Sequence, residues 1–298
     1  MIDTLREMFS YTFLVRAVVV GLLVALCASL LGVSLVLKRY SMIGDGLSHV
    51  GFGTLAIATA MNAAPLTVSI PIVLLAAFFL LRISENSKIK GDAAIALIST
   101  SSLAIGVMVI SLTTGMNTDV CNYLFGSILA MSNDDVTLSI ILAVVVLGLF
   151  VLFYNKIFAV TFDETFARAT GVRSGLYNML IAFLTAITIV LGMRMMGALL
   201  ISSLIIFPAL TSMRLCKKFK TVTVCSAIVS TLCFFCGVVI SYIKATPTGA
   251  SVVLVNIAAF LLFSALRYVP WAKLKSRFLP PKETGMPDRP DSHEREVS

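Results

Sequence analysis

Long apolar segments recur along most of the chain, and they restrict the possible fold more than any other feature. A transmembrane helix needs about 20 predominantly apolar residues, and many apolar segments of this sequence have about that length. Charged residues make up only 13% of the chain, whereas soluble domains average about 25%. We therefore predict an all-α membrane protein with about nine transmembrane helices, at residues 13–37, 42–61, 65–82, 93–114, 134–154, 175–192, 196–213, 221–243 and 249–266.

One apolar stretch, residues 175–213, is too long for a single crossing. The sequence Gly192-Met193-Arg194-Met195-Met196-Gly197 interrupts it, and we place a break between two helices there. Arg194 then falls in an outer turn, where a charge costs little. Arg16, near the outer end of the first span, is expected to extend its charged group to the interface.

The basic residues are divided unequally between the two sets of connecting loops. Of the 23 Lys and Arg residues, all but Arg6, Arg16, Arg194 and Lys244 fall on one side. Since Lys and Arg accumulate in cytoplasmic loops, we expect the N-terminus outside and the C-terminus in the cytoplasm, which requires an odd number of spans. The net charge of +8 is then a topology signal at an anionic leaflet, and no nucleic-acid partner is predicted.

The spans divide the chain into three parts. Residues 1–12 form an extracytoplasmic N-terminal segment, residues 13–267 a single transmembrane domain, and residues 268–298 a cytoplasmic tail. From residue 273 onward the tail is rich in proline and charge, so it cannot bury apolar surface and is expected to be disordered. The outer segment 115–133 contains an apolar run that is too short to cross, which suggests a re-entrant or interfacial helix.

Two ionisable residues, Asp45 and His49, lie within the second predicted span. Positions four apart share one helix face, and ionisable groups inside a membrane are expensive and usually functional. Oxygen and nitrogen donors together suit a divalent transition metal, but an ion needs about four ligands or more. Two copies of the chain facing each other would supply them. The alternative is a buried Asp–His hydrogen bond that only holds helices together.

The cytoplasmic loop 155–173 is predicted to contain a short amphipathic helix at about 161–171. Thr161 and Glu164 have the spacing of a capping box, with Thr161 as the N-cap and Glu164 reaching back. Gly171 suits the C-terminal stop. This helix is either a linker on the membrane surface or a docking element for a cytoplasmic partner, and the residues themselves leave both interpretations open.

The sequence offers no catalytic site. No GxxxxGK[ST] segment is present, so the chain lacks a phosphate-binding loop of its own. Cys233 and Cys236 have CxxC spacing inside an apolar span, and we interpret them as small buried residues rather than as metal ligands.

Four segments carry a family resemblance: Gly44–His49 (GDGLSH), Tyr123–Leu129 (YLFGSIL), Phe162–Glu164 (FDE) followed by Ala167–Val172 (ARATGV), and Leu199–Arg214, which includes SSLIIFPA at Ser202–Ala209. Together they resemble the permease subunits of bacterial ABC importers for zinc, manganese and iron(II), the metal ABC-3 permeases.

The resemblance implies a pore in the bacterial cytoplasmic membrane, built from a homodimer or from two homologous permeases. It implies that cytoplasmic ATPase subunits drive transport, that an extracytoplasmic solute-binding protein delivers the ion, and that Asp45 and His49 contact the metal in transit. It also implies docking of the ATPase at the short helix, through Thr161, Asp163, Glu164, Phe166 and Gly171. The chain would then be no enzyme and would hold no permanent cofactor.

Two other functions are compatible with these residues. A permease for a bulkier metal chelate, such as a siderophore or corrinoid, would need a wide apolar path and no direct ligands. A proton-coupled secondary transporter would use the Asp45–His49 pair as a proton relay and would work without an ATPase.

Overall fold

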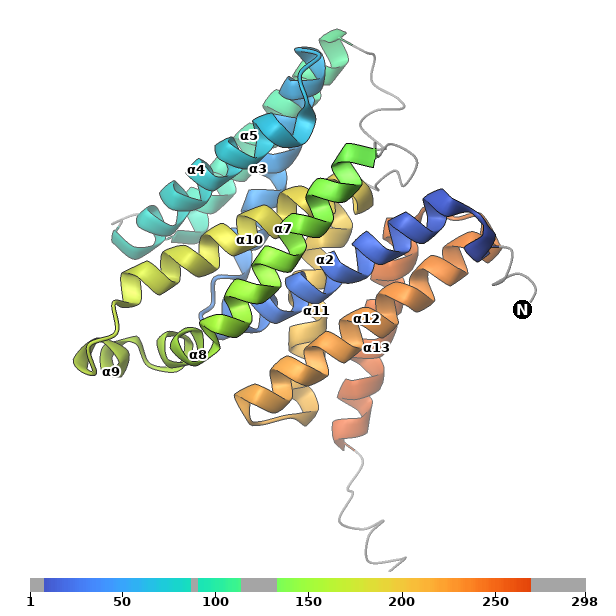
Figure 1. The fold of residues 1–298 in the computed structure, drawn as a ribbon. Helices are drawn as coiled ribbons and strands as arrows, with labels where there is room; N and C mark the ends of the chain where they lie inside the picture. Colours follow the sequence, from blue (N-terminus) through green and yellow to red (C-terminus); the bar gives the residue numbers. More distant parts are fainter. Residues whose placement is uncertain (1–7, 87–90, 114–132, 269–298) are drawn as a thin grey trace, which may run out of the picture.

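The computed structural model describes residues 8–86, 91–113 and 133–268 (Figure 1), and the secondary structure in these ranges is helical throughout. Its long helices are α2 (Thr12–Leu37), α3 (Ser41–Ala60), α4 (Pro65–Asn86), α5 (Gly91–Thr113), α7 (Asn133–Leu152), α10 (Ser174–Met196), α11 (Ala198–Leu215), α12 (Phe219–Lys244) and α13 (Thr248–Tyr268). Two short helices, α8 (Tyr154–Phe162) and α9 (Glu164–Ala169), follow α7. The predicted all-helical class is confirmed, and each predicted span coincides with one long helix.

Within the described ranges, eight helices are long and apolar enough to cross a membrane, and α3 is the long helix not among them. Helix α3 contains Asp45 and His49 together with several glycine and serine residues, which lower its apolar character. The predicted number of crossings and the sidedness of the termini stay predictions. The outer segment 115–133 and the tail lie almost entirely outside the described residues.

The break between α10 and α11 is a single residue, Gly197. Gly197 is the C-cap of α10 and the N-cap of α11, with φ 83° and ψ 163°. Residues that carry a Cβ rarely adopt this backbone conformation. The predicted break is therefore confirmed, although α10 continues through Arg194 to Met196, four residues beyond the predicted end of that span.

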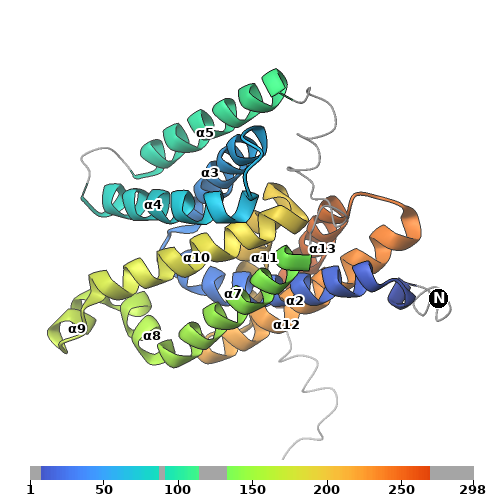
Figure 2. The same cartoon turned by 45° about the horizontal axis from the view of Figure 1, so that its top comes forward.

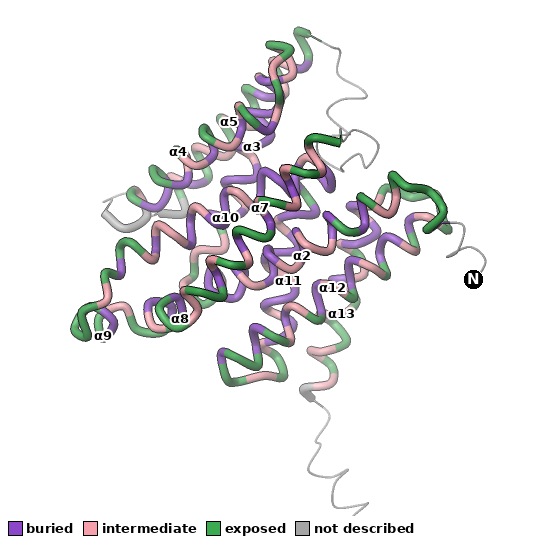
Figure 3. The backbone as a smooth tube through the Cα atoms, viewed as in Figure 1, coloured by how far each residue is buried: buried purple, intermediate pink, exposed green. Residues whose placement is uncertain are grey.

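The long helices form two groups that meet along α10 (Figures 1 and 2). Helices α3, α4 and α5 pack together, while α2 contacts α7, α10, α11 and α12 in the larger group. Buried residues concentrate in α2 and α10, whereas α5, α7 and α13 expose most of their apolar surface (Figure 3). Such exposed apolar surface suits lipid, which is as apolar as the side chains that it contacts.

Glycines allow two of these helix pairs to approach closely. A Cβ at Gly53 of α3 would lie 2.7 Å from the carbonyl oxygen of Ser102 in α5. A Cβ at Gly32 of α2 would lie 2.0 Å from the carbonyl oxygen of Ile205 in α11. Backbone therefore packs directly on backbone at both places, as expected for small residues between membrane helices.

The capping box predicted for the short cytoplasmic helix is wrong. Asp163, not Thr161, is the N-cap of α9, and its Oδ1 accepts a hydrogen bond from the backbone N–H of Phe166 at 2.8 Å. Thr161 belongs to α8 and donates its hydroxyl to the carbonyl of Ile157 at 2.6 Å. The side chain of Glu164 is hydrogen-bonded elsewhere, so it is not the reciprocal partner of Thr161.

The predicted stop at Gly171 is confirmed. Gly171 follows the C-cap Thr170 with φ 83°, and Val172 and Gly171 donate backbone hydrogen bonds to the carbonyls of Ala167 and Arg168. This pairing is the Schellman motif, in which glycine is favoured because the position is left-handed.

Candidate metal-binding site

Asp45 and His49 face each other on one side of α3. The Nε2 atom of His49 lies 3.7 Å from Oδ2 of Asp45. An ion held at about 2.1 Å from each atom could bridge any gap up to about 4.2 Å, so this spacing allows one metal to contact both. At 3.7 Å the two atoms are too far apart for a hydrogen bond, so the observed geometry does not support the purely structural interpretation of the pair.

The surface that carries the pair is only partly covered by the other described helices of the chain. The Asp45 side chain is 41% exposed and that of His49 26%, although the glycines and Leu47 on the other sides of α3 are buried. Met42, one turn before the aspartate, is also exposed. The residues Met42, Asp45 and His49 therefore form an open strip along α3, which we call the α3 strip.

The second nitrogen of His49 has an unusual environment. Its Nδ1 atom is buried, and no described residue forms a hydrogen bond with it. Metal-bound imidazoles usually donate their other N–H to a carboxylate, a carbonyl or water. The two donor atoms thus fit a metal ion, while a hydrogen-bond partner that would hold the imidazole ring is not supplied by the described part of this chain.

Helix α11 is attached to α3 beside the pair. The hydroxyl of Ser48 donates to the carbonyl of Asp45 at 2.7 Å, and Ser202 of α11 donates to the hydroxyl of Ser48 at 3.2 Å. Ser48 is buried and Ser202 partly exposed. Sequence reasoning did not assign Ser202 to the site, although it lies in the fourth segment that carried the family resemblance.

A single chain does not complete a metal site in the ranges that the structure describes, because no group of three or more His, Cys, Asp or Glu side chains comes together there. The CxxC cysteines are not part of one. Cys233 is buried as expected, but Cys236 is exposed, so the prediction that both are buried is wrong for Cys236. Positions three apart point about 60° apart around a helix, and this turn is enough to place Cys236 on the side of α12 that its neighbours α2, α11 and α13 leave open.

Two arginines near the predicted outer end have polar partners. Arg194 is only 15% exposed, and its Nη2 lies 3.2 Å from Oδ2 of Asp135 in α7. Our prediction of an inexpensive charge in an outer turn is wrong for Arg194, since the helix continues past it and packing buries it. The exposed Arg16 donates a hydrogen bond to Oδ1 of Asn133.

The residues predicted to meet a cytoplasmic partner have different environments. Phe166 is 65% exposed, and Asp163 and Gly171 are also exposed. Thr161 is buried and so is withdrawn from the surface. Glu164 is turned toward the helical bundle.

Glu164 meets Lys38 and Asn178, which sequence reasoning did not include in any site. Its Oε2 atom lies 3.6 Å from Nζ of Lys38 and accepts a hydrogen bond from Asn178 at 3.4 Å. Partial burial raises the pKa of Glu164, but the hydrogen bonds from Arg168 and Asn178 and the charge of Lys38 outweigh that effect and bring the pKa below its ordinary value. The carboxylate is therefore ionised at neutral pH.

Comparison with known proteins agrees with this architecture. Residues 10–267 match the ABC 3 transport family. The chain is 33% identical to a Thermotoga maritima protein named "Probable metal transport system membrane protein", over 86% of this chain and 90% of that one. It is 28% identical to the high-affinity zinc uptake system membrane protein ZnuB of Haemophilus influenzae, over 85% of this chain and 97% of that one.

A solved structure has the same fold. It is described as PsaBC from Streptococcus pneumoniae in complex with Fab, and it superposes with a TM-score of 0.80 at 28% identity, covering 92% of this chain and all of that one. The family match covers nearly the whole described helical bundle, including α3 with its Asp–His pair, and we conclude that this chain belongs to the ABC 3 transport family.

Proposed function

We propose that the chain is the membrane-spanning permease subunit of an ATP-driven ABC importer that moves zinc, manganese or iron(II) across the bacterial cytoplasmic membrane. The Asp45–His49 pair on the α3 strip carries this proposal. A carboxylate and an imidazole together suit all three ions, and a cargo ion must exchange part of its hydration shell for protein ligands as it passes. The metal-transport names of the relatives support a metal cargo.

The site is completed by a second subunit, either another copy of this chain or a homologous permease. Two chains related by a two-fold axis would place two carboxylates and two imidazoles around one path. The partly exposed α3 strip and the partly exposed Ser202 beside it support this arrangement. A solute-binding protein on the outer side delivers the ion to this path.

ATP hydrolysis takes place on a cytoplasmic ATPase partner, which docks at α8 and α9. This end of the bundle exposes the rings of Phe158, Phe162 and Phe166, and aromatic side chains are the usual anchors of protein interfaces. Phe158 and Phe162 lie with ring centroids 5.0 Å apart and both contact Phe219. This aromatic surface, with Asp163 at its edge, is the docking element.

The test is uptake of radiolabelled metal by the complete transporter reconstituted in liposomes. Asp45→Ala and His49→Ala should each abolish uptake while the complex still assembles, because each variant removes a ligand. Met42→Ala is the matched control, since it changes an exposed side chain on the same strip and leaves the oxygen and nitrogen donors of Asp45 and His49 in place. Near-normal uptake by both ligand variants would refute the proposed role of the pair.

The same assay separates the two other functions. Uptake that continues without the ATPase and follows a proton gradient would identify a secondary transporter. Uptake of a metal chelate, with no uptake of the free ion, would identify a chelate permease. Testing the three ions in competition establishes the preferred metal.

A further inference from the structure

Lys38 occupies an unusually enclosed position for a lysine. It is the C-cap of α2, and its side chain is only 6% exposed. Its Nζ atom donates to the carbonyl of Val160 in α8 at 3.1 Å and to Oδ1 of Asn178 in α10, and it lies 3.6 Å from Glu164 in α9. One ammonium group therefore connects four helices.

These contacts attach α9 to the bundle through side chains. Glu164 accepts a hydrogen bond from Arg168 at 2.6 Å, and Arg168 also donates to Ser174 at the start of α10 at 2.6 Å. A buried charge that loses its partner is costly, so a displacement of α9 that separated Glu164 from Lys38 would be opposed. We therefore expect Lys38 and α9 to move together.

The chain leads directly from Lys38 to the metal ligands. Helix α2 ends at Leu37 and α3 begins at Ser41, and between them Arg39 has φ 60°, in the left-handed region that few non-glycine residues adopt. The Lys38 ammonium lies 5.7 Å from the ring centroid of Tyr40. Asp45 follows on the second turn of α3, so this tight turn joins the Lys38 cluster to the site.

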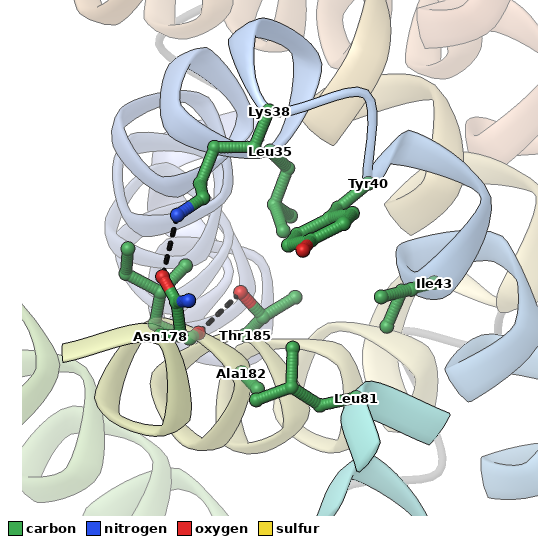
Figure 4. A pocket seen from close by; sticks show the side chains of 9 residues that line it. Leu35, Lys38, Tyr40, Ile43, Leu81, Asn178, Ala182 and Thr185 are labelled. Carbon is green, nitrogen blue, oxygen red and sulfur yellow. Dashed lines mark hydrogen bonds between the residues drawn. The ribbon is translucent and has the colours of Figure 1, made fainter. Parts of the chain in front are cut away.

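A cavity beside this turn leaves room for it to move. Figure 4 shows its lining, in which Lys38 and Asn178 are joined by a hydrogen bond at one side and Tyr40, Ile43 of α3 and Ala182 of α10 surround the space. The volume open to the centre of a water molecule is about 10 Å³, close to the least that holds one water. Well-packed interiors resist displacement, so a void at the joint between α2 and α3 permits a small shift of Tyr40 and Ile43.

We propose that Lys38, Glu164 and Asn178 form a mechanical joint that transmits displacement of α9 to α3 and so repositions Asp45 and His49. Lys38 is a positioning residue in this scheme, because it touches neither the cargo ion nor the ATPase. The inference rests on the proposed function. It adds that the coupling between ATP hydrolysis and transport depends on an enclosed lysine, whose contact residues Glu164 and Asn178 are far from it in the sequence.

The experiment measures ATP hydrolysed per metal ion transported by the reconstituted complex. Lys38→Met, which keeps the apolar stem and removes the charge, should raise this ratio about tenfold, within the range of known coupling energies. It should leave metal binding and ATPase retention unchanged. Lys38→Arg should restore most of the coupling, since it keeps the charge and the adjacent cavity offers space. Lys244→Met, which changes an exposed lysine at the end of α12, is the matched control and should behave as wild type.

Two further variants keep the proposal falsifiable if Lys38→Met does not fold. Glu164→Gln is nearly isosteric and should raise the same ratio, and the effects of Lys38→Met and Glu164→Gln should not add in the double variant. Phe166→Ala, in contrast, should lose the ATPase itself. An unchanged ratio in Glu164→Gln, or a ratio that Lys38→Arg does not restore, would overturn the joint.

Failure of the joint and failure of the proposed function give different results. If Asp45→Ala and His49→Ala both transport metal normally, the proposed site is wrong whatever the ratio for Lys38→Met. If Asp45→Ala abolishes transport while Lys38→Met and Glu164→Gln remain fully coupled, the site stands and only the joint is wrong.

Discussion

Replacing Gly53 with alanine tests whether the position of α3 depends on its close contact with α5. The new Cβ would lie 2.7 Å from the carbonyl oxygen of Ser102, whereas ordinary contact begins at 3.4 Å. The two backbones would have to separate by about 0.7 Å, and neither atom can rotate away. Overpacking of this kind costs about 1–3 kcal/mol, and the shift moves the helix that carries Asp45 and His49.

The assay is thermal unfolding of the purified protein, followed with a thiol-reactive dye. Cys236 is exposed and reacts in the folded protein, whereas Cys27 and Cys233 are buried, so the additional labelling that appears on heating reports loss of the fold. At one scan rate the midpoint should fall by about 2–4 °C for each kcal/mol lost, and metal uptake should fall with it. Reduced uptake at an unchanged midpoint would show that Gly53→Ala acts on the site without loosening the helix contact.

Two glycine-to-alanine variants are matched controls. A Cβ at Gly148 of α7 has no atom within 4 Å, and one at Gly44 of α3 has its nearest neighbour at 3.5 Å. Both should be neutral or slightly stabilising, since alanine favours a helix by up to about 1 kcal/mol over glycine. If Gly53→Ala is as stable and as active as these controls, the argument from close helix packing is refuted.

Three other predictions concern stability. Asp163→Ala removes the N-cap of α9 and should cost about 1 kcal/mol, measured as faster amide exchange across Glu164–Ala169; unchanged exchange would contradict the cap. Asp135→Asn removes the carboxylate charge that lies 3.2 Å from the enclosed Arg194 and should lower stability by about 1–3 kcal/mol, whereas Asp134→Asn on the exposed side of the same turn should be neutral; equal effects would show that the pair is unimportant. The pKa of Glu164 is lowered, so the ionised carboxylate stabilises the packing of α9 on the bundle above the ordinary carboxyl pKa, and this stabilisation is lost as the pH falls through the lowered pKa. Protection of α9 against amide exchange, corrected for the intrinsic exchange rate, should therefore be constant from pH 6 to 8 and fall only in acid. Loss of protection near pH 6 would contradict this prediction.

The helices and the spacing of the Asp–His pair could be predicted from the sequence because both depend on short-range patterns. An apolar run of sufficient length predicts a transmembrane helix without any knowledge of its neighbours. Residues four apart lie about one turn apart in any α-helix, so Asp45 and His49 share a face however α3 packs. The contact between Glu164 and Lys38 was not predictable in this way. Each of these charges looked like a solvated loop residue, since nothing local indicates that α8, α9 and α10 close around the end of α2.

Similar local motifs can compete, and tertiary contacts decide between them. Thr161 and Asp163 are both acceptable N-caps by residue type. Asp163 was selected because Thr161 continues α8 and Glu164 is drawn toward Lys38 and Asn178. Arg194 was misjudged for a related reason: its burial depends on α7, whose Asp135 is 59 residues away in the chain.

The amino-acid sequence by itself determined the helical membrane architecture, the turn at Gly197 and a carboxylate one turn from an imidazole, because apolar length, a left-handed φ angle and helical periodicity act within a few residues. Only the tertiary structure decided that this pair stays partly exposed on α3, that Ser202 lies beside it and that Lys38 is enclosed where four helices meet. Those features depend on which faces remain after the helices have packed, and packing joins residues as far apart as the 140 positions between Lys38 and Asn178.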